Sequence, residues 1–280
     1  METILVTGAT GNVGRHVVNE LHAAGHPVRA LTRSPADANL PAGVEVVRGE
    51  LPDLAESVLD GVGPVFLVWP FTTADDAPPV IDLIARHASR VVFLSARGVP
   101  DDDDAANAPG ALFHARVESL LRHSGVESTF LRAGGFASNT LLWADGVREG
   151  VVRWIYGDAV RPLVHEHDLA DVAVRALTEP GHAGERYELT GPEALTQADQ
   201  LRLIGEAVGR DVRWEELDVA AARADLLARG WAPDFVEGGL AYWATLIDNP
   251  ESVTKTVEEV TGKPGRSFGE WARDHADAFR

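Results

Sequence analysis

The sequence predicts an α/β protein with a doubly wound parallel sheet and a smaller, mostly helical C-terminal lobe. Short apolar runs alternate with helical patterns through the first two thirds of the 280 residues, as in βαβ units around a parallel sheet. A glycine-rich segment separates the first apolar run from the first helical pattern. From Thr196 onward the pattern is mostly helical, which predicts the separate lobe.

The apolar runs are the expected strands. They are rich in Val, Leu and Phe and show little alternation of polar and apolar positions, which is typical of strands buried on both faces. The runs are Ile4–Thr7, Val28–Thr32, Val44–Val47, Val65–Val68, Val91–Leu94 and Ser128–Leu131. A further strand is expected at Glu185–Thr190.

Helical patterns connect and follow these runs. Val13, Val17, Val18 and Leu21 share one face of the first expected helix, and Gly25 stands where its C-terminal cap belongs. The other expected helices are Pro78–Ala88, Leu112–His123, Asp168–Thr178 (with Asp168 as N-cap and Asp171 in the first turn), Thr196–Val208, Ala220–Arg229, Pro233–Ile247, Glu251–Thr261 and Phe268–Phe279.

This order of elements predicts two domains. Residues 1–155 form the sheet-based domain, residues 160–190 return to its sheet, and residues 191–280 form the smaller lobe on the substrate side. The acidic segment Asp101–Asp104 and the Ala/Asn/Pro/Gly stretch after it are expected to form a mobile, solvated loop.

Charge and composition exclude several classes of function. The formal net charge is −18, from 43 acidic and 25 basic side chains, and no stretch is dominated by Lys or Arg. Such a surface repels nucleic acid and anionic membranes, so neither is an expected partner. The chain has no cysteine, which excludes disulfides, zinc–thiolate sites and thiol catalysis. No signal peptide and no apolar run of about 20 residues is present, so a soluble, cytoplasmic protein is expected.

The glycine-rich segment, Thr7-Gly8-Ala9-Thr10-Gly11-Asn12-Val13-Gly14, has the context of a dinucleotide-binding turn. A strand precedes it, a helix follows it, and a second strand begins about 20 residues on. Gly8 and Gly11 leave room for a diphosphate, Gly14 lets helix and strand approach, and the helix offers N–H groups and its positive end. Thr10, Asn12 and Val13 are therefore expected to bind the nucleotide together with the three glycines.

The end of the second strand indicates which nucleotide is bound. Proteins that bind NAD usually carry an acidic residue there for the ribose hydroxyls. This chain has neutral Thr32 followed by Arg33 and Ser34, which suit a 2′-phosphate. NADP(H) is thus the expected cofactor, the alternative being that Arg33 is only a solvated loop residue.

Motifs along nearly the whole chain resemble the NmrA-like family, an atypical branch of the short-chain dehydrogenase/reductases. They are Val6–Gly11, Leu31–Arg33, Val65–Val68, Val92–Ala96, Glu118 with Ser124–Val126, Leu131–Phe136, Val164–Asp171 and Tyr187–Pro192. Two departures are Ala133, in place of a usual proline, and Glu50, in place of a usual aspartate. The resemblance implies a Rossmann-like core, NADP(H) binding and a substrate cleft under the C-terminal lobe. The family contains quinone reductases and also redox-sensing regulators without turnover.

The acid–base pair of orthodox superfamily members, Tyr-x-x-x-Lys, is absent. Four residues after Tyr156, Tyr187 and Tyr242 stand Val160, Gly191 and Leu246, and the two lysines lie near the C-terminus. On the helix after the fifth strand, where orthodox members carry this pair, stand His114 and Glu118, one helical turn apart. One interpretation makes His114 a proton donor oriented by Glu118, with Ser95 binding a substrate oxygen. The other makes His114 a surface or nucleotide-facing residue paired with Glu118 by chance.

Aromatic residues near the expected strand ends are candidate ligand contacts. Trp69 and Pro70 are expected near the cofactor and Phe71 near the substrate, because open α/β sheets bind ligands at this edge. Phe136, Asn139 and Trp143 are candidate substrate contacts, although most such aromatics belong to cores. No metal is expected: His165 and His167 lack a third ligand, and capping accounts for Asp168.

Three functions remain open at this point. The first is NADPH-dependent reduction of a quinone-like or other conjugated carbonyl compound, since a conjugated acceptor delocalises the arriving charge and depends less on a proton donor. The second is a redox sensor that binds NADP(H) without turnover and is read by a protein partner. The third is a non-hydride tailoring enzyme of aromatic secondary metabolism. A small-molecule substrate is expected in the first and third, and a homodimer is compatible with all three.

Overall fold

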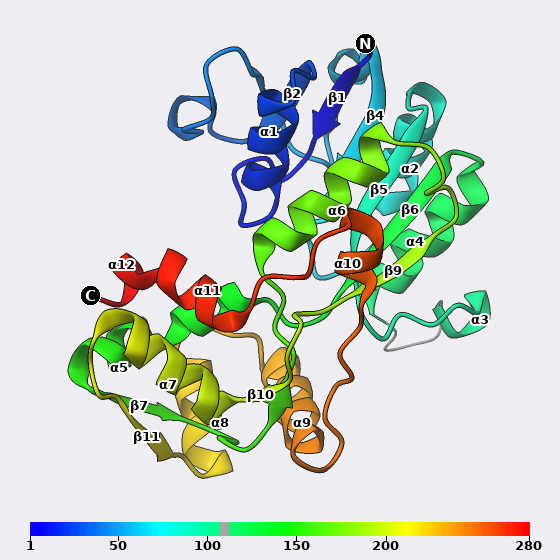
Figure 1. The fold of residues 1–280 in the computed structure, drawn as a ribbon. Coiled ribbons are helices and arrows are strands. Elements are labelled where there is room, and N and C mark those ends of the chain that lie inside the picture. The colour runs from blue at the N-terminus through cyan, green and yellow to red at the C-terminus, as the bar shows by residue number, and fades with distance from the viewer. Residues whose placement is uncertain (107–111) are drawn as a thin grey trace. The chain divides into compact units, whose positions relative to one another are not determined.

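The computed structural model describes residues 1–106 and 112–280 (Figure 1). The chain divides into two compact units. The first unit comprises Met1–Gly134, Glu166–Leu189 and Thr256–Lys263. The second unit comprises Gly135–His165, Thr190–Lys255 and Pro264–Arg280.

The first unit is built on a seven-stranded parallel sheet in the order β3-β2-β1-β4-β5-β6-β9. The strands are β1 (Thr3–Val6), β2 (Val28–Thr32), β3 (Glu45–Arg48), β4 (Val62–Leu67), β5 (Arg90–Ala96), β6 (Glu127–Ala133) and β9 (Arg186–Leu189). The chain winds outward from β1 to β3 on one side and from β4 to β9 on the other. The sheet is therefore doubly wound, and the predicted Rossmann-like fold class is confirmed.

Helices cover both faces of this sheet (Figure 1). They are α1 (Gly14–Ala23), α2 (Ala77–His87), α4 (Phe113–Ser124), α6 (Glu166–Thr178) and α10 (Thr256–Thr261). The short helix α3 (Asp103–Ala106) packs against α4, and short 3-10 turns lie at Pro35–Asp37 and Glu56–Leu59. α1 packs against α6 on one face, and α2 packs against α4 on the other. The sheet is buried between them, so Leu5, Val65 and Phe93 lie in a continuous apolar core.

The second unit combines small strand pairs with helices. β7 (Val151–Trp154) pairs in parallel with β11 (Arg213–Glu216), and β8 (Val160–Arg161) pairs antiparallel with β10 (Leu195–Thr196). The helices are α5 (Ala144–Glu149), α7 (Gln197–Val208), α8 (Val219–Ala228), α9 (Pro233–Asp248), α11 (Phe268–Asp274) and α12 (Ala276–Phe279), preceded by a 3-10 segment at Ala137–Trp143. Their apolar faces meet in a core of their own around Trp271.

Several expected boundaries differ from the structure. α6 begins at Glu166, so Asp168 is not its N-cap but a buried residue of its first turn. The helix expected at Glu251–Thr261 begins only at Thr256, and the last expected helix is interrupted at His275. The solvated loop expected from residue 101 begins with the short helix α3, and its remainder includes residues 107–111, outside the described residues.

The first unit also ends earlier than the expected boundary at residue 155. It ends at Gly134, directly after β6, and residues 166–189 return to it, including β9 beside β6. The intervening β7 pairs with β11, which lies about 60 residues later in the chain, and so belongs to the second unit. Across residues 1–106 and 112–280, no helix is long and apolar enough to cross a membrane.

Candidate functional site: a nucleotide-binding turn and its surroundings

The glycine-rich turn lies at the carboxyl end of β1 and leads directly into α1. Gly8 adopts a φ of +59°, and a Cβ there would lie 2.9 Å from Val68 Cβ, just after β4. A Cβ on Gly14 would lie 2.8 Å from the carbonyl carbon of Gly8. Backbone conformation at Gly8 and close approach at Gly14 therefore both require glycine.

The remaining glycine of the turn, Gly11, faces open space. Gly11 is exposed, and Gly8 O, at 3.2 Å, is the one described atom close to where its Cβ would stand. α1 has no acidic residue in its first turn and no described side-chain cap at its N-terminus. The positive end of the helix dipole thus faces the side on which Gly11 leaves room, an arrangement suited to a diphosphate.

The remaining predicted residues of the turn differ in what they can offer a ligand. Thr10 is half-buried, and its carbonyl oxygen accepts a hydrogen bond from Arg15 Nη2 at 2.9 Å. Asn12 is exposed, whereas the side chain of Val13 is buried in the core. Val13 can therefore contact a nucleotide only through its backbone.

Thr7 connects the turn to the neighbouring strand. The N–H of Val68 donates a hydrogen bond to Thr7 Oγ1 at 2.7 Å, and the N–H of Thr7 donates to Phe66 O at 3.0 Å. These bonds join the carboxyl ends of β1 and β4, the two central strands at which the order of the sheet reverses. Open α/β sheets bind their ligands at this switch point.

Two arginines stand at the carboxyl ends of the next strands. Arg33 follows β2, and Arg48 ends β3, where it is in register with Thr32. Both arginines are exposed, and neither forms a hydrogen bond or ion pair with a described residue. Ser34 is also exposed, and its N–H donates to Thr32 Oγ1 at 3.3 Å. Two unpaired guanidinium groups at this edge favour a phosphate ligand.

Arg48 was not among the residues expected from the sequence. Its role depends on the register between β2 and β3, which brings it beside Thr32 from 16 positions along the chain. A basic residue at the end of a predicted neighbouring strand is the signal that could have revealed it.

Trp69 is a core residue. Its ring is 4% exposed, its Nε1–H donates to Thr73 O at 2.7 Å, and it packs edge-on against Phe71 with ring centroids 5.1 Å apart. Pro70 is exposed and Phe71 half-buried, so these two residues, rather than the indole, present surface at the end of β4.

The carboxylate of Glu118 does not orient His114. Glu118 is fully buried, and its Oε1 accepts hydrogen bonds from Ser95 Oγ at 2.6 Å and from Arg132 Nε at 3.0 Å. Its Oε2 accepts from Arg132 Nη2 at 2.7 Å. The expected His114–Glu118 pair is therefore replaced by a buried Ser95–Glu118–Arg132 network, because an adjacent strand supplies a stronger partner than the next helical turn does.

Arg132 is a second residue that sequence reasoning missed. It lies in β6, and its side chain also forms an ion pair with Asp101 at 2.9 Å. An arginine within an otherwise apolar strand must find an acidic partner when it is buried, and this signal could have indicated a carboxylate partner for Arg132.

His114 lies near the start of α4 without a described hydrogen-bond partner for its Nδ1, which is buried. Its ring stacks on Phe113, with centroids 3.8 Å apart, and lies 6.2 Å from the ring of Phe93. Burial lowers the pKa of His114 to about 4. The ring is thus neutral at pH 7: it can donate a hydrogen bond, but it carries no positive charge and Glu118 does not orient it.

The three candidate substrate residues of the second unit have different environments. Phe136 is half-buried and Asn139 is exposed. Trp143 is 5% exposed and packs edge-on against Trp214, with centroids 5.6 Å apart. Trp143 is therefore a core residue, and Phe136 and Asn139 remain available to a ligand.

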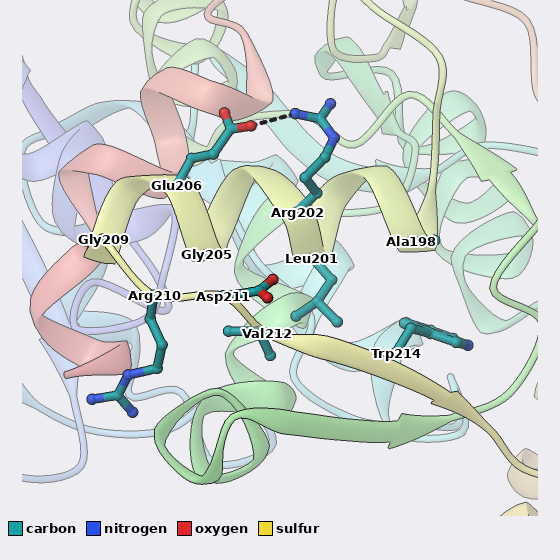
Figure 2. Close-up of a pocket in the computed structure, with 10 residues that line it drawn as sticks. All are labelled: Ala198, Leu201, Arg202, Gly205, Glu206, Gly209, Arg210, Asp211, Val212 and Trp214. Carbon is teal, nitrogen blue, oxygen red and sulfur yellow. Dashed lines mark hydrogen bonds and ion pairs between the residues drawn. The ribbon is translucent and has the colours of Figure 1, made fainter.

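A hollow of about 360 Å³ lies in the second unit along α7 and the segment that leads into β11 (Figure 2). Leu201, Val212 and Trp214 give it an apolar floor. Arg202 and Glu206, on the helix above, pair with each other at 2.6 Å. None of the predicted site residues lines it, and all of its lining residues belong to the second unit.

The chain resembles known proteins over nearly its whole length. The model of the NmrA-like family matches residues 1–263. The chain is 43% identical over 284 residues to a (4-alkanoyl-5-oxo-2,5-dihydrofuran-3-yl)methyl phosphate reductase of Streptomyces griseus subsp. griseus, with 99% of each chain covered. It is 34% identical over 284 residues to an NAD(P)H azoreductase of Xenophilus azovorans, again with 99% of each covered.

A solved structure has the same fold. The NADPH-dependent quinone oxidoreductase of Escherichia coli in complex with NADPH superimposes with a TM-score of 0.78 at 25% identity, covering 97% of this chain and 99% of that one. Together with the family match over most of the chain, this resemblance shows that the protein belongs to the NmrA-like family.

Proposed function

We propose that this protein is an NADPH-dependent reductase of a quinone-like or other conjugated carbonyl compound. The observation that carries the proposal is the glycine turn at the switch point of the sheet, with Arg33 and Arg48 unpaired at the neighbouring strand ends. A diphosphate fits the first feature and a 2′-phosphate the second.

The cofactor is NADP(H). Gly8, Gly11 and Gly14 leave the room that its diphosphate needs, and Arg33, Ser34 and Arg48 would hold its 2′-phosphate. When bound, the nicotinamide supplies or accepts a hydride. The protein binds and orients it, while the buried Ser95–Glu118–Arg132 network keeps β5, β6 and α4 in fixed positions beside the strand ends.

The names of the relatives support the reductase activity and the type of substrate. The relatives are reductases of a phosphate ester, of azo compounds and of quinones. The first name describes a dihydrofuran whose ring double bond is flanked by an oxo and an alkanoyl group, which is a conjugated carbonyl compound.

The proton chemistry of the chain is consistent with a conjugated acceptor. The chain has no Tyr-x-x-x-Lys pair, and His114 is neutral at pH 7. A neutral imidazole can stabilise a developing oxyanion by a hydrogen bond without giving up its proton. Such weak assistance is sufficient when the acceptor delocalises the charge itself, whereas an isolated ketone needs a stronger acid.

Titration with NADPH and NADH, followed by NADPH oxidation with menadione and with an alkanoyl-substituted dihydrofuranone, tests the proposal. We expect tighter binding of NADPH and oxidation that depends on the acceptor. Tight NADPH binding with no oxidation by either acceptor would contradict the reductase and favour a sensor.

A further inference from the structure

We propose that Arg15, in the first turn of α1, binds the diphosphate of the dinucleotide from beside the glycine-rich turn. The inference rests on the NADP(H) binding of the proposed function and does not depend on which substrate is reduced. All residues that carry it belong to the first unit. Arg15 is not among the residues that the sequence motifs predict to bind the nucleotide.

The side chain of Arg15 is fixed against the glycine-rich turn. Its Nη2 donates a hydrogen bond to Thr10 O at 2.9 Å. The backbone N–H of Arg15 donates to Gly11 O at 3.2 Å. One residue thus engages two consecutive carbonyl groups of the turn, and the remaining N–H groups of the guanidinium lie beside the turn.

The polar groups that this turn offers to a ligand are hydrogen-bond donors. The backbone N–H groups of Val13 and Gly14 donate to no atom of a described residue. The carbonyl oxygens of Thr10 and Gly11, which would repel an anion, are engaged by Arg15. Unpaired N–H groups and a guanidinium on one turn suit a phosphate ligand.

The charge of Arg15 has no compensation within the first unit as the structure describes it. A cation in the first turn of a helix faces the positive end of the helix dipole, which is unfavourable. α1 has no acidic residue in its first turn, and no carboxylate of a described residue pairs with Arg15, which is exposed. The first turns of α6 and α7 carry Glu166 and Asp199 instead. A diphosphate would compensate both the guanidinium and the helix end.

Arg15 should therefore differ in its role from the two arginines at the strand ends. Arg33 follows β2 and Arg48 ends β3, where the 2′-phosphate is expected. Arg15 stands at the turn that receives the diphosphate. Both nucleotides have a diphosphate, whereas NADP(H) alone has the 2′-phosphate. Arg15 should thus contribute to the affinity for NADPH and NADH equally, without selecting between them.

Equilibrium binding of NADPH, NADH and adenosine 2′-monophosphate tests this inference. The third ligand has the 2′-phosphate but no diphosphate, and its binding is measured by displacement of NADPH. We expect Arg15→Gln to weaken NADPH and NADH binding about tenfold each and to leave adenosine 2′-monophosphate binding within about twofold of the wild type. Arg15→Lys, which keeps the charge but not the planar fork, should lie between the wild type and Arg15→Gln.

The salt dependence of binding distinguishes a charge contact from a purely structural role. Added NaCl weakens NADH binding by screening the attraction between the diphosphate and nearby cations. This dependence should be smaller in Arg15→Gln than in the wild type, because one of these cations is gone. The same salt dependence in both proteins would contradict the contact.

Arg86→Gln is the matched control. Arg86 is an exposed arginine in the last turn of α2, so its loss removes the same charge away from the glycine-rich turn. It should change the binding of none of the three ligands.

Three results with Arg15→Gln would overturn the inference. They are unchanged binding of NADPH and NADH, a loss confined to NADPH, and equal weakening of all three ligands. The second would place Arg15 at the 2′-phosphate, and the third would show a general disturbance of the first unit. All measurements are made without an acceptor. NADPH binding without quinone reduction would thus contradict the reductase alone, whereas a wild type that binds no NADPH would contradict both proposals.

Discussion

Ser95 Oγ donates a hydrogen bond to Glu118 Oε1 at 2.6 Å, within a buried network that Arg132 completes. The proton of the Ser95 hydroxyl is therefore directed at a carboxylate and not at a ligand. Ser95 itself is 3% exposed. The residue that sequence reasoning placed on a substrate oxygen thus belongs to the structural link between β5 and α4.

Replacing Glu118 by glutamine should destabilise the fold by about 3 kcal/mol, because the fully buried partner of Arg132 loses its charge. Ser95→Ala removes one hydrogen bond and should lower the free energy of unfolding by only about 1 kcal/mol. Urea unfolding of the two variants measures this difference. Equal effects, or a loss of turnover in Ser95→Ala without any loss of stability, would contradict the structural role.

Arg33→Ala and Arg48→Ala should each weaken NADPH binding about tenfold and leave NADH binding within about twofold, because each removes a donor to the 2′-phosphate alone. Dissociation constants measured by nucleotide fluorescence give both values. Arg86→Ala, an exposed arginine on α2, is the control and should change neither. Equal losses for NADPH and NADH would contradict the assignment of Arg33 and Arg48.

The strands of the central sheet could be predicted because the pattern that identifies each strand lies within a few consecutive residues. A strand buried on both faces has apolar residues at consecutive positions, as in the run Val91–Leu94. The strand β5 contains that run. The glycine turn is equally local: strand, turn and helix follow one another without interruption. Neither prediction needed knowledge of distant partners.

The rest of the structure depends on partners far apart in the chain. The two-residue strand β8 is defined only by its pairing with β10, and β7 only by β11. The i, i+4 spacing suggested His114 as the partner of Glu118, but Arg132 on β6 binds the carboxylate more strongly. Helix periodicity contains no information about a neighbouring strand, so the i, i+4 spacing alone could not reveal Arg132 as the partner.

Gly14→Ala should abolish binding of both nucleotides, since its Cβ would overlap the carbonyl group of Gly8 and displace the turn. Overpacking of this kind should also lower the free energy of unfolding by about 1–3 kcal/mol. Gly238→Ala in α9 is the matched control. No described atom lies within 4 Å of where its Cβ would stand, so the substitution should stabilise the helix by about 0.5–1 kcal/mol. Retained NADPH binding in Gly14→Ala would contradict the packing argument.

His114 should make the stability of the protein fall as the pH is lowered. Its pKa is about 4 in the folded state and 6.5 in the unfolded chain, so the unfolded state binds the extra proton between these values. The contribution of His114 is fully present above pH 6.5 and is lost as the pH falls toward 4. Between pH 7.5 and pH 5 the loss amounts to about 2 kcal/mol.

Urea unfolding at pH 7.5 and pH 5 measures this loss in the wild type and in His114→Gln, which cannot titrate. The decrease in stability should be smaller in the variant by about 2 kcal/mol. His123→Gln is the control, because its side chain is 67% exposed. The same pH dependence in wild type and His114→Gln would mean that the pKa of the ring is not lowered in the folded state. An unshifted His114 would carry a proton in a substantial fraction of molecules near pH 6.5, and a strong proton donor for an unconjugated carbonyl would then be present.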